Sequence, residues 1–478
     1  MQYIYRCLGS SFLLLFALIA VHACWSNIAA CIDVQDQASI FWPWLTGILF
    51  LSLIFVSSVF RAENAGSIHV RALGFILVTI LLRLAWLWYF DSQQVNDFLD
   101  YWHCGQVLAN AESSPRCTGV YFSRSFVYTL PVHLFLTGSQ AALELVNVFF
   151  VSAAAVFFYD FARRIFPPAI AAMALLFFTW NPDLWYGITL ANPDIPFAFY
   201  FSLLTWVLVQ LDLFLHSRSS GFVPVFVWAL CAGMLIFIVD IQRDYGLPIW
   251  IALAVLCLYL TAKFRNRQLC PQAFAGPRAR TGRLKYVLLI SVFFVLIPYC
   301  VYSGAQTLFT RSTHVSHQDQ TLAYITSMDV FGSGYYQERR PWQEDYFPRL
   351  PEKLQEDFAL KKFVQELITD PDETLNHFTR KNSVLASPYG TLWLSSRPAE
   401  DQSVGRINTK NYNMQMAVNN ILAAVVFGLV ALRIVLLPAW GLPRESMFLV
   451  LFTAFFYLLI LFLAEAQERY PLFTVFLT

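Results

Sequence analysis

The sequence predicts an all-α polytopic membrane protein with about eleven transmembrane helices and a large, mainly helical extracytoplasmic segment. The chain is 58% hydrophobic and only 13% charged, with a mean hydropathy of +0.54. This is far too apolar for a soluble globular protein. Apolar runs of about 20 residues, long enough to cross a hydrocarbon layer of about 30 Å, recur along the chain. Basic residues also collect on alternate connections between these runs.

The candidate helices centre on residues 8–25, 41–60, 72–90, 139–160, 167–180, 194–215, 221–241, 245–263, 285–304, 419–437 and 446–464. The first run has features of a secretory signal peptide, because Arg6 precedes it and the small residues Ala29 and Ala30 follow it. We favour a membrane anchor, because the run is long for a signal core and the second helix needs a partner of opposite direction.

Lysine and arginine mark the connections that we expect to face the cytoplasm. These residues are Arg61, Arg71, Arg163, Arg164, Arg218, the basic run from Lys263 to Lys285, Arg433 and Arg444. The intervening connections therefore face outward, and they comprise residues 26–40, 91–138, 181–193, 242–244, 305–418 and 465–478. This alternation predicts a cytoplasmic N-terminus.

The predicted organisation is a membrane domain interrupted by one large outward segment. Residues 1–304 form the transmembrane domain with the outward loop 91–138, residues 305–418 form the extracytoplasmic segment, and residues 419–478 form the C-terminal transmembrane helices. Within the outward segment, EKLQEDFALKKFVQELI at 352–368 has its apolar residues at helical spacing, which predicts an amphipathic helix.

The cysteine spacing and the net charge limit which metal sites and partners the protein is expected to have. The nine cysteines lack metal-ligand spacing such as CxxC, and we assign no metal site and no cofactor. Cys104 and Cys117 share the outward loop 91–138, where they are either two free thiols or a disulfide formed by a loop that doubles back. A net charge of +1 indicates no nucleic-acid partner. The chain has no Asn-x-Ser/Thr sequon, which favours a bacterial inner membrane over the endoplasmic reticulum.

Polar residues at the outward ends of the helices are the functional candidates, because ionisable groups near membrane depth are costly unless they have a function. They are Arg83, Asp97, Asp100, Asn192, Asp194, Asp240, Arg243, Asp244, Glu465, Glu468 and Arg469. Arg83 lies inside the run 72–90. Its side chain therefore either snorkels outward or meets a carboxylate or a phosphate.

The stretch QQVNDFLDYWHCGQ at 93–106 places Asp97 and Asp100 just outside an apolar run. A carboxylate at the membrane surface can take a proton from an attacking hydroxyl or amine, and arginines on the same face can stabilise a phosphate leaving group. Together these groups suit the transfer of a sugar from a lipid phosphate. The alternative is an amphipathic surface helix in which Asp97 and Asp100 lie on one side and Tyr101 and Trp102 are interfacial aromatics.

The order of these motifs resembles the GT-C superfamily of polytopic glycosyltransferases, especially the protein O-mannosyltransferases and their bacterial relatives that use polyprenyl-phosphate sugars. These enzymes have a motif of the form Asp-Glu-x-x-Tyr after an early membrane helix. Residues 97–101, DFLDY, match its Asp and Tyr but have Phe98 where Glu is usual. The resemblance implies that Asp97 is the catalytic base and that the second acid is either Asp100 or absent.

Further stretches are similar to the same pattern in the same order, namely YFSRSFVYTLPVHLFLTG, ANPDIPFAFYFSLL, IQRDYGLPIWIALAVL and QERYPL. The resemblance implies an extracytoplasmic transfer from a polyprenyl-phosphate sugar to a glycan, lipid or protein acceptor. Arg83, Arg243 and Arg469 are then the donor-phosphate contacts. The candidate substrate contacts are Trp102, which could stack on sugar or serve as an interfacial anchor, and Asn192, Asp194, Asp244 and Glu468.

Two other functions fit part of the pattern. An oligosaccharide polymerase or ligase also joins many helices to a large outward loop that contains arginine. A multi-pass transporter would need paired broken helices and an inverted repeat, and no such repeat is evident in the sequence.

Overall fold

The computed structural model describes residues 41–62, 64–89, 94, 97–181, 184–185, 187–216, 222–243, 249–250, 253–254 and 291–313, and the isolated positions 361, 365, 368 and 369. Within these residues every regular element is a helix, and none is a strand. The predicted all-α class is therefore confirmed for this part of the chain.

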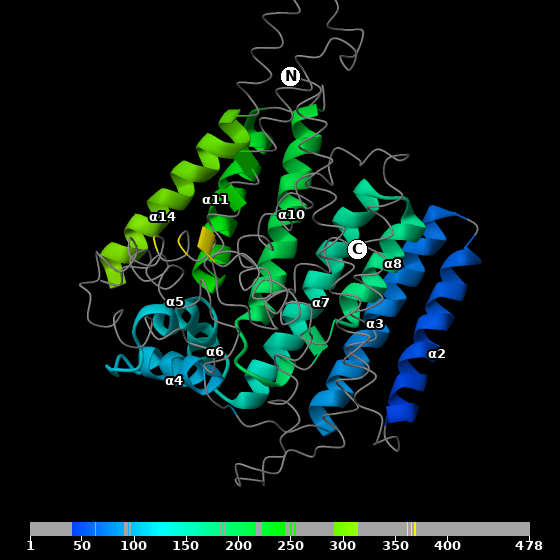
Figure 1. The fold of residues 1–478 in the computed structure, drawn as a ribbon, viewed down its shortest axis with the longest axis horizontal. Coiled ribbons are helices and arrows are strands. Elements are labelled where there is room, and N and C mark those ends of the chain that lie inside the picture. The colour runs from blue at the N-terminus through cyan, green and yellow to red at the C-terminus, as the bar shows by residue number, and fades with distance from the viewer. Residues whose placement is uncertain are drawn as a thin grey trace, which may run out of the picture.

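The apolar helices run up and down through one bundle (Figure 1). They are α2 (Phe41–Phe60), α3 (Ala65–Tyr89), α7 (Gln140–Ile165), α8 (Pro168–Thr179), α10 (Asp194–His216), α11 (Phe222–Arg243) and α14 (Ile297–Thr313), which continues from the π-helical turn η4 (Val292–Leu296). Five of the described helical segments are long and apolar enough to cross a membrane. This is consistent with a multi-pass membrane protein.

The predicted number of about eleven spans is not confirmed. The candidate runs 8–25, 419–437 and 446–464 lie outside the described residues, and only four positions of the run 245–263 lie within them. Two boundaries also differ from the prediction. The helix α3 begins at Ala65 instead of residue 72, because Asn64 Oδ1 accepts a hydrogen bond from the Ser67 N–H (2.9 Å) and caps the helix. The helix α14 ends at Thr313 instead of residue 304.

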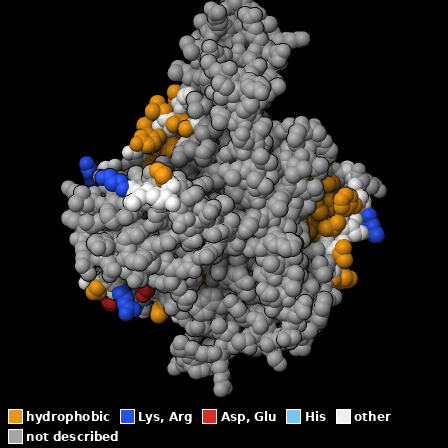
Figure 2. Space-filling view, in the orientation of Figure 1, with side chains coloured by type: hydrophobic (Ala, Val, Ile, Leu, Met, Phe, Trp, Pro, Cys, Tyr) orange, Lys and Arg blue, Asp and Glu red, His pale blue; other side chains and the backbone are white. Residues whose placement is uncertain are grey.

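Burial distinguishes the centre of the bundle from its flanks. The helix α10 packs between α7 and α11, and Phe197, Phe201 and Leu204 are fully buried. The flanking helices instead expose apolar side chains, among them Leu53 and Phe60 on α2, and Figure 2 shows such apolar side chains at opposite flanks of the molecule. Exposed apolar surface of this extent fits contact with lipid acyl chains.

The helices α11 and α14 approach each other closely at Gly233. A Cβ atom at this position would lie 2.6 Å from the Pro298 carbonyl oxygen and 2.7 Å from Val301 Cβ. Small residues allow membrane helices to approach in this way. Further along, the Tyr302 hydroxyl donates to Asp240 Oδ2 (2.7 Å), so the ionisable Asp240 is hydrogen-bonded inside the bundle.

The predicted outward loop 91–138 folds as three short helices that lie together at one end of the bundle (Figure 1). They are α4 (Asp97–Ala109), α5 (Gly119–Val127) and α6 (Thr129–Phe135), and we call residues 94 and 97–138 the end layer. A small core of Phe98, Tyr101, Tyr128 and Val132 packs on Leu143, Leu190 and Ala191. On the side of α14, the rings of Phe122 and Phe126 contact Phe309.

The large outward segment is described at only four positions. Residues 361, 365, 368 and 369 are helical, and the Thr369 hydroxyl donates to the Gln365 carbonyl oxygen (2.9 Å). These positions agree with the helix predicted over 352–368. The remainder of the segment 305–418 beyond α14 lies outside the described residues.

Candidate functional site

Asp97 is the first residue of α4, where the helix N-terminus favours a negative charge. Its Oδ1 accepts a hydrogen bond from the Tyr121 hydroxyl of α5 (2.9 Å), and both side chains are partly exposed. Burial, followed by the charge and the hydrogen bond of Asp97, raises the pKa of Tyr121. Tyr121 therefore stays protonated and remains a donor to the carboxylate.

Asp100 lies one turn further along α4 in a looser environment. Its Oδ1 is 3.8 Å from Arg116 Nη1, and the Arg116 side chain is 78% exposed. Solvent-exposed ion pairs of this kind contribute little, typically 0 to about 1 kcal/mol. The two acids predicted from the sequence are thus both in the end layer, but Asp97 is held by a hydrogen bond from a partly buried group and Asp100 by a weak surface pair.

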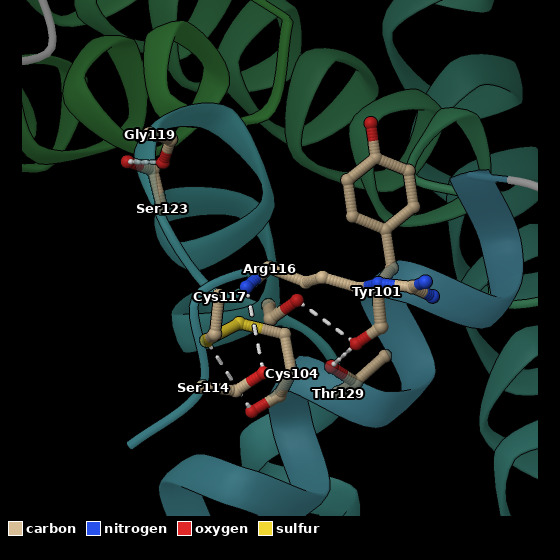
Figure 3. Close-up of a disulfide and its surroundings, with 9 residues drawn as sticks. Tyr101, Cys104, Ser114, Arg116, Cys117, Gly119, Ser123 and Thr129 are labelled. Carbon is tan, nitrogen blue, oxygen red and sulfur yellow. Dashed lines mark hydrogen bonds between the residues drawn. A yellow bond between two sulfur atoms is a disulfide. The ribbon is translucent and has the colours of Figure 1, made fainter.

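Tyr101 is buried, and it is not the interfacial aromatic of the alternative reading. Its carbonyl oxygen accepts hydrogen bonds from Ser125 Oγ (2.9 Å) and Thr129 Oγ1 (2.8 Å), the second of which is drawn in Figure 3. Its hydroxyl accepts from Arg124 Nη1 (2.7 Å), and its ring lies 5.1 Å from the ring of Tyr121. These contacts join α4 to α5 and α6.

A disulfide joins Cys104 of α4 to Cys117, just before α5, with 5.0 Å between the Cα atoms (Figure 3). The doubled-back loop that the sequence left open is therefore confirmed. The link keeps the end of the α4–α5 connection against α4. Trp102, the candidate sugar contact, is partly buried, and its ring packs 4.2 Å from the ring of His133 on α6.

Two side chains, Gln94 and Tyr128, attach the end layer to the predicted outward connection 181–193. Gln94 donates to the Thr189 carbonyl oxygen (3.0 Å), and its own Oε1 accepts from the Ala191 N–H (2.7 Å). The Tyr128 hydroxyl donates to Asn147 Oδ1 (2.5 Å), and Asn147 Nδ2 donates to the Leu190 carbonyl oxygen (2.9 Å). The structure thus brings together two connections that the charge pattern places on one side of the membrane.

Arg83 is fully buried inside the bundle, which rules out the first of its two predicted alternatives, a side chain that snorkels outward. Its Nη2 donates to the carbonyl oxygen of Thr179 (2.9 Å), the last residue of α8, where a cation is favoured by the helix dipole. Its guanidinium also lies 5.1 Å from the ring centroid of Trp185. Nε and Nη1 of Arg83 have no acceptor among the described residues. An unpaired buried cation is costly, so these two N–H groups are suited to an anionic oxygen.

Asn192 and Asp194 are buried at the start of α10. Asn192 Oδ1 accepts a hydrogen bond from the Asp194 N–H (3.0 Å), which satisfies a backbone donor at the helix N-terminus. Both residues thus help to begin α10, and their substrate contacts stay predictions. The backbone of Arg243 ends α11, while Asp244, Glu468 and Arg469 lie outside the described residues. In the part of the chain that the structure describes, no three His, Cys, Asp or Glu residues gather as metal ligands.

Sequence reasoning missed Tyr121 and Arg124 of α5. It also missed Gln94 and Asn147, whose side chains hydrogen-bond the backbone of the connection 181–193. One signal was available for Tyr121, because a bridge between Cys104 and Cys117 places the residues after Cys117 beside α4. No signal marked Gln94 or Asn147, since their partners are backbone atoms of a segment about 40 to 100 residues away along the chain.

The arrangement combines a fixed, partly exposed carboxylate at one end of a membrane bundle with a buried cation inside it. The first can accept a proton from a group that arrives from the aqueous side. The second has two N–H groups without an acceptor among the described residues, and a guanidinium of this kind favours an anionic oxygen. No protein-family profile matches this chain, and no curated protein matches it. The GT-C resemblance therefore rests on the short motifs alone.

Proposed function

We propose that this protein is a GT-C type glycosyltransferase that moves a sugar from a polyprenyl-phosphate donor to an acceptor on the extracytoplasmic side of the membrane. One observation carries the proposal. The carboxylate of Asp97, the acid of the DFLDY motif, is held at its Oδ1 by Tyr121 and stays partly exposed at the end of the bundle. A general base needs both a fixed orientation and access to its substrate.

The reaction proposed is a single inverting displacement. Asp97 takes the proton of the acceptor hydroxyl or amine as that group attacks the anomeric carbon, and the bond from this carbon to the phosphate oxygen breaks. The electron pair of that bond leaves with the polyprenyl phosphate. Arginines stabilise the charge on the leaving phosphate. Of the three proposed donor contacts Arg83, Arg243 and Arg469, Arg83 is supported by its two N–H groups without an acceptor among the described residues.

The partners follow from the same proposal. The donor is a lipid-linked sugar whose phosphate lies near membrane depth, and the acceptor is a glycan, lipid or protein that reaches the end layer from outside. Trp102 stacks on sugar, and Asp100 acts as an orienting or second acid. The proposed location is the inner membrane of a bacterial cell.

The test is sugar transfer by the full-length protein in liposomes, with radiolabelled polyprenyl-phosphate sugars as donors. Asp97→Asn keeps the shape of the side chain and removes the base, so we expect a fall of about 100-fold or more. Asp100→Asn should cost less, because Asp100 has only a weak surface pair. The matched control is Glu112→Gln in the same layer, whose side chain is exposed and whose activity should equal that of the parent.

Three outcomes would count against the proposal. Full activity of both the Asp97→Asn and the Asp100→Asn variants, and of the double variant, would remove the carboxylate mechanism. Transfer only from a polyprenyl-diphosphate oligosaccharide would indicate a polymerase or ligase. Uptake of a solute into vesicles without a covalent product would indicate a transporter.

A further inference from the structure

Tyr121 lies outside the set of residues predicted from the sequence, yet its hydroxyl contacts the proposed base directly. The bond from Tyr121 Oη to Asp97 Oδ1 is 2.9 Å long and joins α5 to the first residue of α4. A hydrogen bond to an ionised acceptor is stronger than one between neutral groups. The bond from Tyr121 is made to Oδ1 of the carboxylate, so it restrains the orientation of the Asp97 side chain.

The surroundings hold Tyr121 in place. Its ring packs on the ring of Tyr101, which is itself fixed by Arg124 at the hydroxyl and by Ser125 and Thr129 at the carbonyl oxygen. The disulfide from Cys104 to Cys117 holds the segment before α5 against α4 (Figure 3). The position of the hydroxyl is therefore set by contacts that do not involve Asp97.

We infer that Tyr121 is a positioning residue that orients the Asp97 carboxylate for proton transfer; this inference rests on the function proposed above. Tyr121 can act in this way across the working pH range, because burial and the charge of Asp97 raise its own pKa.

Other titratable groups lie on each helix of the end layer, and of these Asp100 and Tyr101 interact with Tyr121. Asp100 and Tyr101 lie on α4, Arg124 lies on α5 and contacts Tyr101, and His133 lies on α6 against Trp102. Arg116 pairs with Asp100. Replacement of Tyr121 by phenylalanine leaves all of these groups in place and removes only the hydroxyl.

The experiment compares Tyr121→Phe with the parent in the full-length protein reconstituted in liposomes. We expect kcat to fall about tenfold with an unchanged KM for the donor, because the lost hydrogen bond orients the base and takes no part in donor binding.

The matched control is Tyr128→Phe. Tyr128 lies in the same layer, and its hydroxyl bonds Asn147 instead of a carboxylate. This variant should lower the thermal stability and leave kcat unchanged. A second readout needs no turnover: the rate at which a carbodiimide labels Asp97 at one fixed pH, read by peptide mass, should change in Tyr121→Phe, because the hydroxyl no longer covers Oδ1.

The outcomes separate the two proposals. An inactive Asp97→Asn together with a Tyr121→Phe variant that keeps the parental kcat and Asp97 labelling rate would overturn the role of Tyr121 and leave the glycosyltransferase proposal standing. A changed labelling rate with parental activity in both Asp97→Asn and Tyr121→Phe would overturn the proposed function, and the role of Tyr121 in catalysis with it. An inactive Asp97→Asn with the expected changes in Tyr121→Phe supports both.

Discussion

Substitution of Gly105 by alanine should loosen the end layer that carries Asp97. Gly105 lies on α4 at its contact with Thr129, the first residue of α6. A Cβ atom at position 105 would overlap Thr129 Oγ1 and lie 2.7 Å from Thr129 Cβ and 2.9 Å from the Thr129 carbonyl carbon. Real Cβ atoms do not approach other heavy atoms this closely, so α6 or the Thr129 side chain must move.

The expected loss of stability follows from three contributions. Overpacking of a well-packed site costs about 1–3 kcal/mol. Movement of Thr129 also breaks its hydrogen bond to the Tyr101 carbonyl oxygen, which contributes about 1 kcal/mol. Alanine gains about 1 kcal/mol over glycine inside a helix. The net effect is a destabilisation of about 1–3 kcal/mol.

The assay is thermal unfolding in detergent, combined with limited proteolysis of the end layer. Gly74→Ala on α3 is the matched control, because a Cβ atom there meets nothing within 4 Å; its stability should equal or exceed that of the parent. Adding Thr129→Ala to Gly105→Ala should recover part of the loss, since it removes the overlapping Oγ1. If Gly105→Ala were as stable as Gly74→Ala, the close packing of α4 on α6 would be refuted.

Three further predictions concern the same layer and the topology. The double variant Cys104→Ser/Cys117→Ser should lose about 3 kcal/mol of stability, because the disulfide closes a loop with a sequence separation of 13 residues. Limited proteolysis should then cleave the end layer faster than in the parent, and an unchanged cleavage rate would contradict this prediction. Burial lowers the pKa of His133 below its ordinary value of 6.5, a shift that a hydrogen bond to the Trp102 backbone opposes in part. The unfolded chain then binds this proton more readily than the folded chain does. The free energy of unfolding should therefore be highest above about pH 6.5 and fall as the pH drops through this value. His133→Gln should flatten this dependence, measured by thermal unfolding at about pH 5.5 and about pH 7.5. In intact cells or spheroplasts, an impermeant maleimide should label Asn110→Cys and not Ala65→Cys, and the reverse pattern would invert the proposed orientation.

Hydropathy predicts the long apolar helices of the described residues well, because apolar length is a local property of the sequence. The runs 41–60 and 194–215 correspond closely to α2 and α10. The boundaries failed where a local cap or a distant contact decides the end. Asn64 begins α3 early, and Phe309, which packs on α5 and on Phe237 of α11, lies in the continuation of α14 beyond residue 304.

The site was predictable only in part. The position of Asp97 beside an apolar run is visible in the sequence, and so is the pair of cysteines that forms the disulfide. The partner of Asp97 is not, because Tyr121 is 24 residues away and reaches it only when the connection folds back as α5. The sequence also does not predict that the outward loop folds as a packed layer, because α5 and α6 are too short to show a clear helical periodicity.

The surroundings of Arg83 depend on packing more than on sequence. Its place inside an apolar run follows from counting residues along α3, but the direction of its side chain depends on the hydrogen-bond acceptors of the neighbouring helix. The acceptor is the free carbonyl oxygen at the end of α8, on Thr179, 96 residues further along the chain. The end of that helix, together with the ring of Trp185, makes an inward position favourable for a cation that would otherwise snorkel to the surface. The sequence alone indicates that burial of the Arg83 cation costs free energy. The contacts that offset this cost exist only because α8 packs against α3.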